Sequence, residues 1–167
     1  MENKVEAWLD GPVAGIPAIL QPVAHTLIQA KNEINAMLQQ FPDNKLWEQP
    51  AGVASVGFHL QHIVGVLDRL FSYAHGKRLS NLQLKYLSEE GLRDDKIGLQ
   101  HLLAALSSKI DSSVEELKTF DPARITEARG VGRKQLPSSV LGLLFHAAEH
   151  TMRHTGQMLV TTKVLAN

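Results

Sequence analysis

The segment LQPVAHTLIQAKNEINAMLQQF (residues 20–41) decides the fold class, because its apolar residues recur at alternating spacings of three and four. This spacing places them in one stripe along an α-helix that packs almost parallel to its neighbours in a bundle. The stripe consists of Leu20, Val23, Leu27, Ala30, Ile34, Met37 and Phe41. Pro22 lies within the segment, so we expect it either to kink the helix or to delay its start.

The same pattern recurs along the rest of the chain. Further long helices are predicted at residues 53–75, 94–119 and 137–164. A short extra helix is predicted between the second and third long helices, at residues 80–91, where Ser80 begins a capping-box pattern. We therefore predict an all-α four-helix bundle that forms a single domain over residues 1–167.

The connections raise more specific expectations. Asp94 and Asp95 are well placed to cap the third long helix, and Pro137 to lie in the first turn of the fourth. Residues 120–139 are rich in Gly and Arg and are predicted to form a connection without strands. Because connections of up to about 20 residues exceed the usual bundle loop, at least one of them is expected to cross an end of the bundle.

The composition excludes several classes of protein. Seventeen basic and seventeen acidic side chains cancel, whereas a protein that binds duplex nucleic acid usually has a basic face. No uninterrupted apolar run approaches the ~20 residues that span a bilayer. The first residues lack the basic region and apolar core of a signal peptide. We expect a cytoplasmic protein with neither a nucleic acid nor a membrane as partner.

The chain has no cysteine. This excludes disulfides, cysteine nucleophiles and thiolate zinc sites. A bound metal must therefore be held by His, Asp or Glu, and any thiol chemistry must use a thiol from outside the chain.

The fourth long helix carries three histidines at intervals of four, in HAAEHTMRHTGQ (residues 146–157). His150 and His154 occupy stripe positions at which a bundle usually has Leu or Ile. Two imidazoles one helical turn apart can reach the same metal ion. His146 and His154 are about 12 Å apart along the axis, so they compete as the partner of His150.

The second long helix contributes His59 and His62, which border its apolar stripe on the same side. One of them, together with two histidines of the fourth helix, would form a three-imidazole site with open positions, as a catalytic metal requires. The alternative is that these histidines are ordinary hydrogen-bonded side chains. The metal is favoured because unpaired buried imidazoles are costly and one ion satisfies several of them. Three other histidines, His25, His75 and His101, are expected to lie outside such a site.

Three stretches resemble the DinB/YfiT-like superfamily of metal-dependent helical bundles: GPVAGIPAILQPVAHTL (11–27), SVGFHLQHI (55–63) and EHTMRHTGQ (149–157). The resemblance covers nearly the whole chain. Family members often have Arg at the position of Thr155, so a role that depends on that Arg has no equivalent here.

The resemblance implies a divalent metal ion, zinc or nickel above all, with His62, His150 and His154 as its ligands. His59 and His146 would then line the pocket or surround the ligands. Gln157, one turn beyond His154, is placed to orient a ligand or a substrate.

Characterised members of the superfamily include transferases and isomerases that use a low-molecular-weight thiol. We therefore expect a metal-dependent enzyme of thiol-dependent transferase or hydrolase type that acts on a small-molecule substrate; the sequence does not identify its catalytic residues. The alternative is a non-enzymatic bundle stabilised by a metal, or a dimeric stress-response or interaction protein. A homodimer is compatible with either reading.

Overall fold

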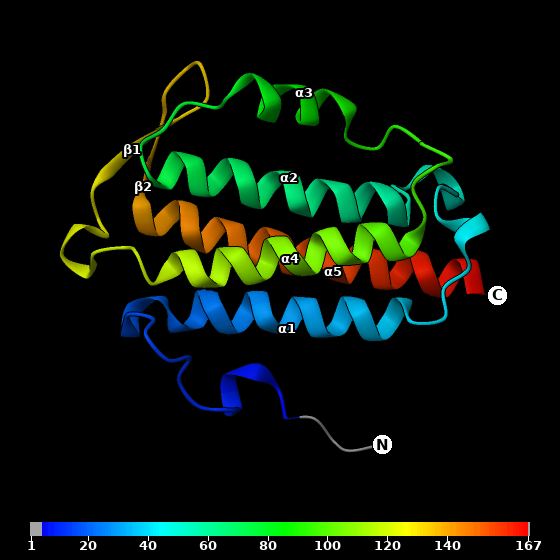
Figure 1. Ribbon diagram of the computed structural model, residues 1–167, viewed down its shortest axis with the longest axis horizontal. Coiled ribbons are helices and arrows are strands. Elements are labelled where there is room, and N and C mark those ends of the chain that lie inside the picture. Colours follow the sequence, from blue (N-terminus) through cyan, green and yellow to red (C-terminus); the bar gives the residue numbers. More distant parts are fainter. Residues whose placement is uncertain (1–4, 167) are drawn as a thin grey trace.

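The computed structural model describes residues 5–166 and confirms the all-α fold (Figure 1). Its long helices are α1 (Gln21–Leu38), α2 (Val56–Ala74), α4 (Leu99–Leu117) and α5 (Val140–Ala166). The short helix α3 (Asn81–Glu89) lies outside the bundle, along α2.

The four long helices form a closed ring in which α1 contacts α4 and α5, and α2 contacts the same two helices. Figure 1 shows that α1 and α5 run in one direction, whereas α2 and α4 run in the other. The core between them is built from the predicted apolar stripes; its fully buried side chains include Leu27, Ile34, Leu60, Ile63, Leu106 and Ile110. Burial of these side chains is the main favourable contribution to folding.

The connection between α2 and α4 runs back along the length of the bundle, because these two neighbouring helices are parallel (Figure 1). It carries α3, which begins with the predicted capping box between Ser80 and Gln83. No residue of α3 is buried. The connection between α2 and α4 therefore follows the outside of α2. The crossing expected of at least one connection occurs between α4 and α5, because these two helices are opposite each other in the ring.

Pro22 delays the start of the first helix and does not kink it. A 3-10 turn (Ala18–Leu20) precedes α1, and Pro22 then lies in the first turn of α1. Its missing N–H costs nothing at this position, because the first N–H groups of a helix have no partner within the helix.

The prediction for the start of the third long helix was wrong. This helix, α4, begins at Leu99, and Asp94 and Asp95 lie before it. The cap comes from a distant part of the chain, since Leu99 N donates to Asp43 Oδ1 at 2.8 Å. Asp95 instead pairs with the Arg93 guanidinium.

The connection before the last helix contains a small hairpin that the sequence analysis missed. Strands β1 (Ala128–Val131) and β2 (Leu136–Ser139) pair antiparallel, with Ala128 opposite Ser139. Pro137 therefore lies in β2. The prediction that it lies in the first turn of α5 was wrong. A proline is tolerated here because it has no N–H to donate and β2 has only one neighbouring strand.

One described segment, Pro50–Ala74, is long and apolar enough to span a membrane by length and composition, with a mean hydropathy of 1.2. Half of its most apolar stretch is buried within the bundle. Packing of α2 against α4 and α5 accounts for this composition.

Candidate metal centre

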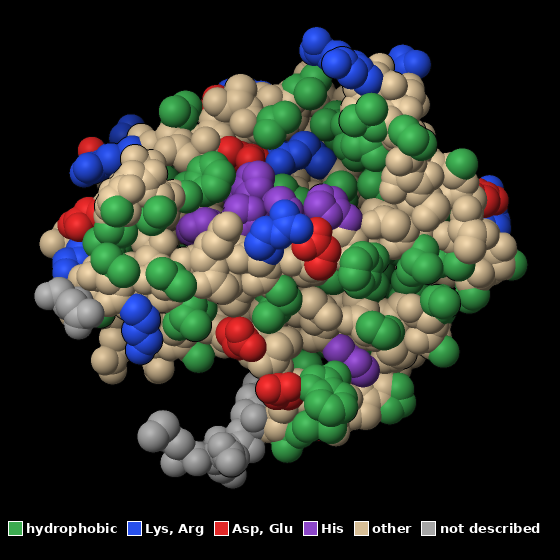
Figure 2. All heavy atoms as spheres, turned by 180° about the vertical axis from the view of Figure 1, so that it is seen from behind, with side chains coloured by type: hydrophobic (Ala, Val, Ile, Leu, Met, Phe, Trp, Pro, Cys, Tyr) green, Lys and Arg blue, Asp and Glu red, His purple; other side chains and the backbone are tan. Residues whose placement is uncertain are grey.

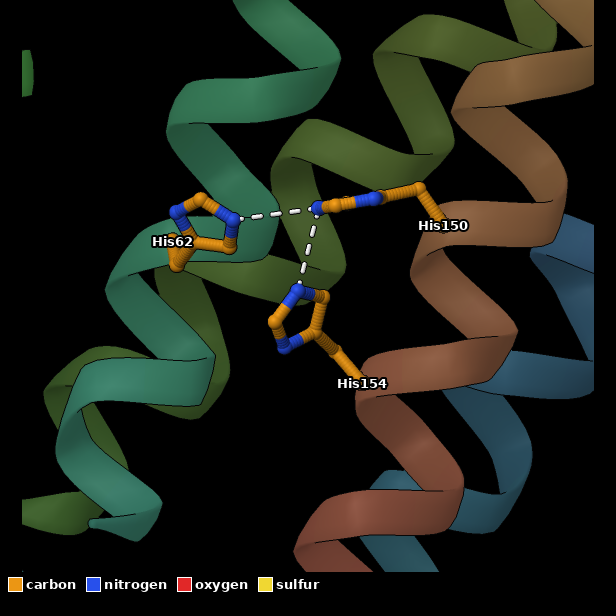
Figure 3. Close-up of side chains that lie close together, drawn as sticks. All are labelled: His62, His150 and His154. Atoms are coloured by element: carbon orange, nitrogen blue, oxygen red, sulfur yellow. Dashed lines mark hydrogen bonds between the residues drawn. The ribbon is translucent and has the colours of Figure 1, made fainter. Parts of the chain in front are cut away.

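Three histidine side chains from two neighbouring helices point toward one another (Figure 3). His62 comes from α2, and His150 and His154 come from successive turns of α5. The Nε2 atom of His150 lies 3.1 Å from Nε2 of His62 and 3.0 Å from Nε2 of His154. The antiparallel packing of α2 against α5 thus joins residues that are 88 positions apart in the sequence.

The arrangement fits a metal ion. Ligand atoms of the three residues lie within 4.8 Å of one another. Three imidazole nitrogens at ~2.0–2.1 Å from a tetrahedral zinc would be about 3.3 Å apart, close to the separations seen here. Three neutral imidazoles also suit zinc and nickel as ligands and leave further coordination positions open.

The protonation of His62 is set by an acidic side chain from outside the bundle. Nδ1 of His62 donates to Glu90 Oε2 at 2.7 Å, which leaves the Nε2 lone pair free to face the other two histidines. Glu90 also accepts a hydrogen bond from the Arg69 guanidinium. Burial alone would raise the pKa of the Glu90 carboxyl, but the hydrogen bonds from His62 and Arg69 outweigh it and lower the pKa. Glu90 is therefore a carboxylate at neutral pH.

A glycine in α2 makes room for this carboxylate. A Cβ atom at Gly65 would lie 2.0 Å from Glu90 Oε1 and 2.6 Å from the Arg69 guanidinium. Such contacts are far inside van der Waals separation, so Glu90 reaches α2 only because position 65 has no side chain.

His59 contacts the cluster through His154. It is buried, and its Nδ1 lies 2.9 Å from Nδ1 of His154. With one proton between these two nitrogens, His154 can donate to His59 and keep its Nε2 lone pair for the site.

His59, His150 and His154 remain neutral at physiological pH. Burial, reinforced by neighbouring histidines, lowers the pKa of His59 to about 4, of His150 to about 4 and of His154 to about 3. Protons thus compete poorly for these nitrogens, which favours a metal ion. Nδ1 of His150 is buried without a hydrogen-bond partner. No described side chain therefore accepts a hydrogen bond from this nitrogen, and the nearby Glu149 carboxylate offsets only part of the lowering of the His150 pKa.

The two remaining candidates lie farther from the convergence point. His146 is exposed, and its Nδ1 donates to Glu149 Oε1 at 2.6 Å. His146, Glu149 and His150 form a second group whose ligand atoms lie within 4.8 Å of one another. Gln157 is exposed, and its side chain makes no hydrogen bond to another described residue.

The deepest side of α5 is not the stripe that contains the histidines. Thr151, Thr155 and Met158 are buried, whereas His150 and His154 lie partly exposed at the edge of the packed face. The site therefore reaches solvent, and Figure 2 shows histidine side chains at the surface in the middle of one face. Phe58 stacks on His62, with ring centroids 5.1 Å apart.

The histidines predicted to lie elsewhere do so. His25 Nε2 contacts Gly11 O at 3.0 Å, and His101 is exposed. His75 follows the last residue of α2, where its Nε2 lies 2.8 Å from Glu116 Oε1.

Sequence reasoning missed Glu90, Arg69 and Phe58 as parts of this site. Glu90 lies just beyond α3, and its approach to His62 depends on the path of the long connection. A signal was nevertheless present in the otherwise apolar α2: an arginine one turn after a glycine, in GVLDR (residues 65–69), indicates a charged side chain that must be compensated by another segment.

Fold and site together define a class of protein: a helical bundle with an edge-exposed cluster of three convergent histidines. The family model of the DinB superfamily matches residues 26–158, and the chain belongs to this superfamily. No functionally curated protein matches the sequence.

Two solved structures share the fold. A conserved protein from Enterococcus faecalis is 18% identical, with a TM-score of 0.68 over 86% of this chain and 95% of that one. A protein from Streptococcus pneumoniae is 13% identical, with a TM-score of 0.62 over 86% of this chain and 88% of that one.

Proposed function

We propose that this protein binds a divalent metal ion, zinc or nickel, through Nε2 of His62, His150 and His154. The observation that carries the proposal is the convergence of these three nitrogens at 3.0–3.1 Å around His150 Nε2. The depressed pKa values of His150 and His154 support it, because both imidazoles remain uncharged at neutral pH and each keeps one nitrogen lone pair.

We further propose that the metal serves catalysis, in a thiol-dependent transferase or a hydrolase acting on a small molecule. A bound divalent cation lowers the pKa of a coordinated thiol or water and so supplies a nucleophile near neutral pH. The protein contributes three neutral ligands from two helices and the carboxylate of Glu90, which orients His62. Partial exposure of the cluster makes it accessible to a substrate and a low-molecular-weight thiol from solvent.

An acidic side chain lies near the proposed metal on the exposed side. Glu149 is held by His146 at 2.6 Å and by Arg153 at 2.6 Å, on the turn of α5 that carries His150. Burial alone would raise the pKa of Glu149, but the hydrogen bonds from His146 and Arg153 outweigh burial. The pKa of Glu149 is therefore lowered. Glu149 is therefore a weak base that suits the binding of a cationic substrate group better than proton abstraction.

The rival function is a non-enzymatic bundle or homodimer that the metal stabilises. The exposed apolar side chains of α5 favour it, because Phe145, Val160 and Val164 are more than half exposed. We place the protein in the cytoplasm under either function; in the described residues the only segment apolar enough to span a membrane is the core helix α2.

Metal analysis of the purified protein tests the proposal. We expect about one zinc or nickel ion per chain, and its loss in His62→Ala, His150→Ala and His154→Ala. His25→Ala and His101→Ala are matched controls that should retain it. Full occupancy of the His154→Ala protein would contradict the ligand set. A metal-loaded protein that converts no electrophile with any thiol, and that dissociates into monomers on chelation, would favour the rival.

A further inference from the structure

A second cleft lies at the end of the bundle where α2 stops and the β-hairpin begins. Its volume is about 490 Å³, within the range of small-molecule sites. The residues that matter for its chemistry are Tyr73, Lys77, Arg78, Leu84, Gly132 and Arg133. None of the described residues that line it is acidic.

The cations of this cleft have no counter-charge. Most lysines and arginines in the described part of the chain are hydrogen-bonded or ion-paired. The exceptions are Lys77, Arg78, Lys96, Arg133 and Lys134. Three of these line the cleft, and Lys134 neighbours it in the hairpin turn. Because the chain as a whole is neutral, this clustering of unpaired positive charge is local. Figure 2 shows Lys and Arg side chains gathered at the upper right, where the hairpin lies.

The neighbouring cleft provides a contrast. It is lined by Asp68, Arg69 and Lys109, among others. There Lys109 pairs with Asp68 at 2.7 Å, and Arg69 pairs with Glu90. The basic side chains of this neighbouring cleft are thus neutralised by acidic ones. Of the two clefts, only the cleft at the hairpin has unpaired positive charge.

The walls of the positive cleft are held in place without using its free cations. Arg129 of β1 donates from Nε to Ala74 O at 2.8 Å, which fastens the hairpin to the last turn of α2. The same guanidinium pairs with Glu127 at 3.1 Å. Gly132 has a φ of +68° and open space where a Cβ would be, so the backbone of the turn is accessible from the cleft.

We propose that this cleft binds a small molecule bearing a di- or triphosphate group, separately from the histidine cluster. Arg78, Arg133 and Lys77 supply the charge-assisted hydrogen bonds that phosphate oxygens accept. Tyr73 and Leu84 supply an apolar wall for the organic part of the ligand. His62 and Ala74 are about 18 Å apart along α2, so an anion in the cleft does not contact the proposed metal ligands.

A small molecule fits better than a nucleic acid. Recognition of a nucleic acid backbone uses a basic stripe or face that extends over several phosphates. Here the unpaired cations are confined to one concave site, and the fifth, Lys96, lies before α4. Concentrated positive charge in a cleft favours a compact anion of high charge.

Calorimetric titration of the full chain with inorganic pyrophosphate at an ionic strength of about 0.1 M tests the proposal. Arg133→Glu should weaken binding at least about tenfold, because it replaces a charge-assisted hydrogen bond with repulsion. Lys96→Glu makes the same change in net charge at an unpaired, exposed lysine elsewhere. It should change the affinity less than about twofold, since exposed charges more than a Debye length apart are screened.

Three results would overturn the proposal. Equal weakening by Arg133→Glu and Lys96→Glu would mean that pyrophosphate responds to overall charge. Loss of binding in His150→Ala with full binding in Arg133→Glu would place the anion at the histidine cluster. Tighter, Arg133-dependent binding of a single-stranded oligonucleotide would make the surface a nucleic acid site.

Discussion

The Nδ1 atoms of His59 and His154 lie 2.9 Å apart. His59 does not face the other two histidines of the site, but this contact determines which nitrogen of His154 carries the proton. His59 is 2% exposed and lies one turn before the buried Ile63 in α2, where it is surrounded by the core. Its effect on the site is therefore exerted through His154.

The first prediction follows from this contact. His59→Leu removes the acceptor of the His154 Nδ1 proton, and metal affinity should fall about 10–100-fold. His59→Gln can still offer an amide oxygen and should recover part of the loss. Competition with a chromophoric chelator measures both affinities. Equal affinities of the wild type and the Leu variant would show that His59 has only a packing role.

The second prediction concerns Gly65. A methyl group in Gly65→Ala would overlap Glu90 Oε1, so we expect a loss of about 1–3 kcal/mol in the free energy of unfolding. Metal affinity should also fall, because the displaced carboxylate no longer orients His62. Chemical denaturation and chelator competition measure the two effects.

Gly156 provides the matched control within another helix. A Cβ at Gly156 meets nothing within 4 Å, and Gly156→Ala should stabilise α5 by about 0.5–1 kcal/mol. If both alanine variants changed the unfolding free energy in the same direction, the steric role assigned to position 65 would be wrong.

The third prediction is for the metal-free protein. The packed helices should keep it folded at neutral pH, unlike a zinc finger. The pKa values of His59 and His154 are depressed from 6.5 to about 4 and about 3, so the unfolded state binds more protons than the folded state below pH 6.5. Stability should therefore be complete above that pH and fall as the pH decreases toward 3.

Thermal unfolding of the chelated protein across this pH range measures the effect. His59→Leu cannot take up the proton at that position, so its melting temperature should depend less steeply on pH than that of the wild type. A metal-free protein that lacks helical signal at pH 7 would instead identify the metal as structural.

The fourth prediction separates His154 from His146 as the partner of His150. Several protons replace one metal ion, so metal release on acidification should be steep and should begin below the ordinary His pKa of ~6.5. The His146→Ala protein should give the same curve as the wild type, because its ring lies toward solvent and pairs with Glu149. Loss of metal from this variant already at pH 7 would move the site back by one turn of α5.

The long-range arrangement of the helices follows from local patterns to a large extent. Stripes such as Leu27–Ile34 and Leu60–Ile63 define which face of each helix is buried, and the histidines could be placed beside them. The start of α4 could not be placed, because its cap is Asp43, 56 residues earlier. The hairpin escaped detection because each strand has only four residues, too few for an alternating pattern, and the turn is rich in glycine and charge.

The site was predictable where ligand spacing along one helix decides it, and unpredictable where a second segment completes it. His150 and His154 are one turn apart on α5, so their cooperation follows from helical geometry. Glu90 reaches His62 through the path of a connection whose direction depends on α2 and α4 being parallel. No local pattern around residue 90 encodes that direction.

The position of α3 outside the bundle links this site to local opening of the chain. α3 has no buried residue, and polar contacts attach it and the residues just beyond it to α2, such as Tyr86 Oη to Gln61 O and Gly91 N to Gln61 Oε1. Segments of this kind open at a lower free energy than the core does, and their amides exchange with solvent sooner. Each opening would withdraw Glu90 from His62 while the four long helices stay packed. The residence time of an ion on the histidines would then be set partly by how often this external segment lifts away.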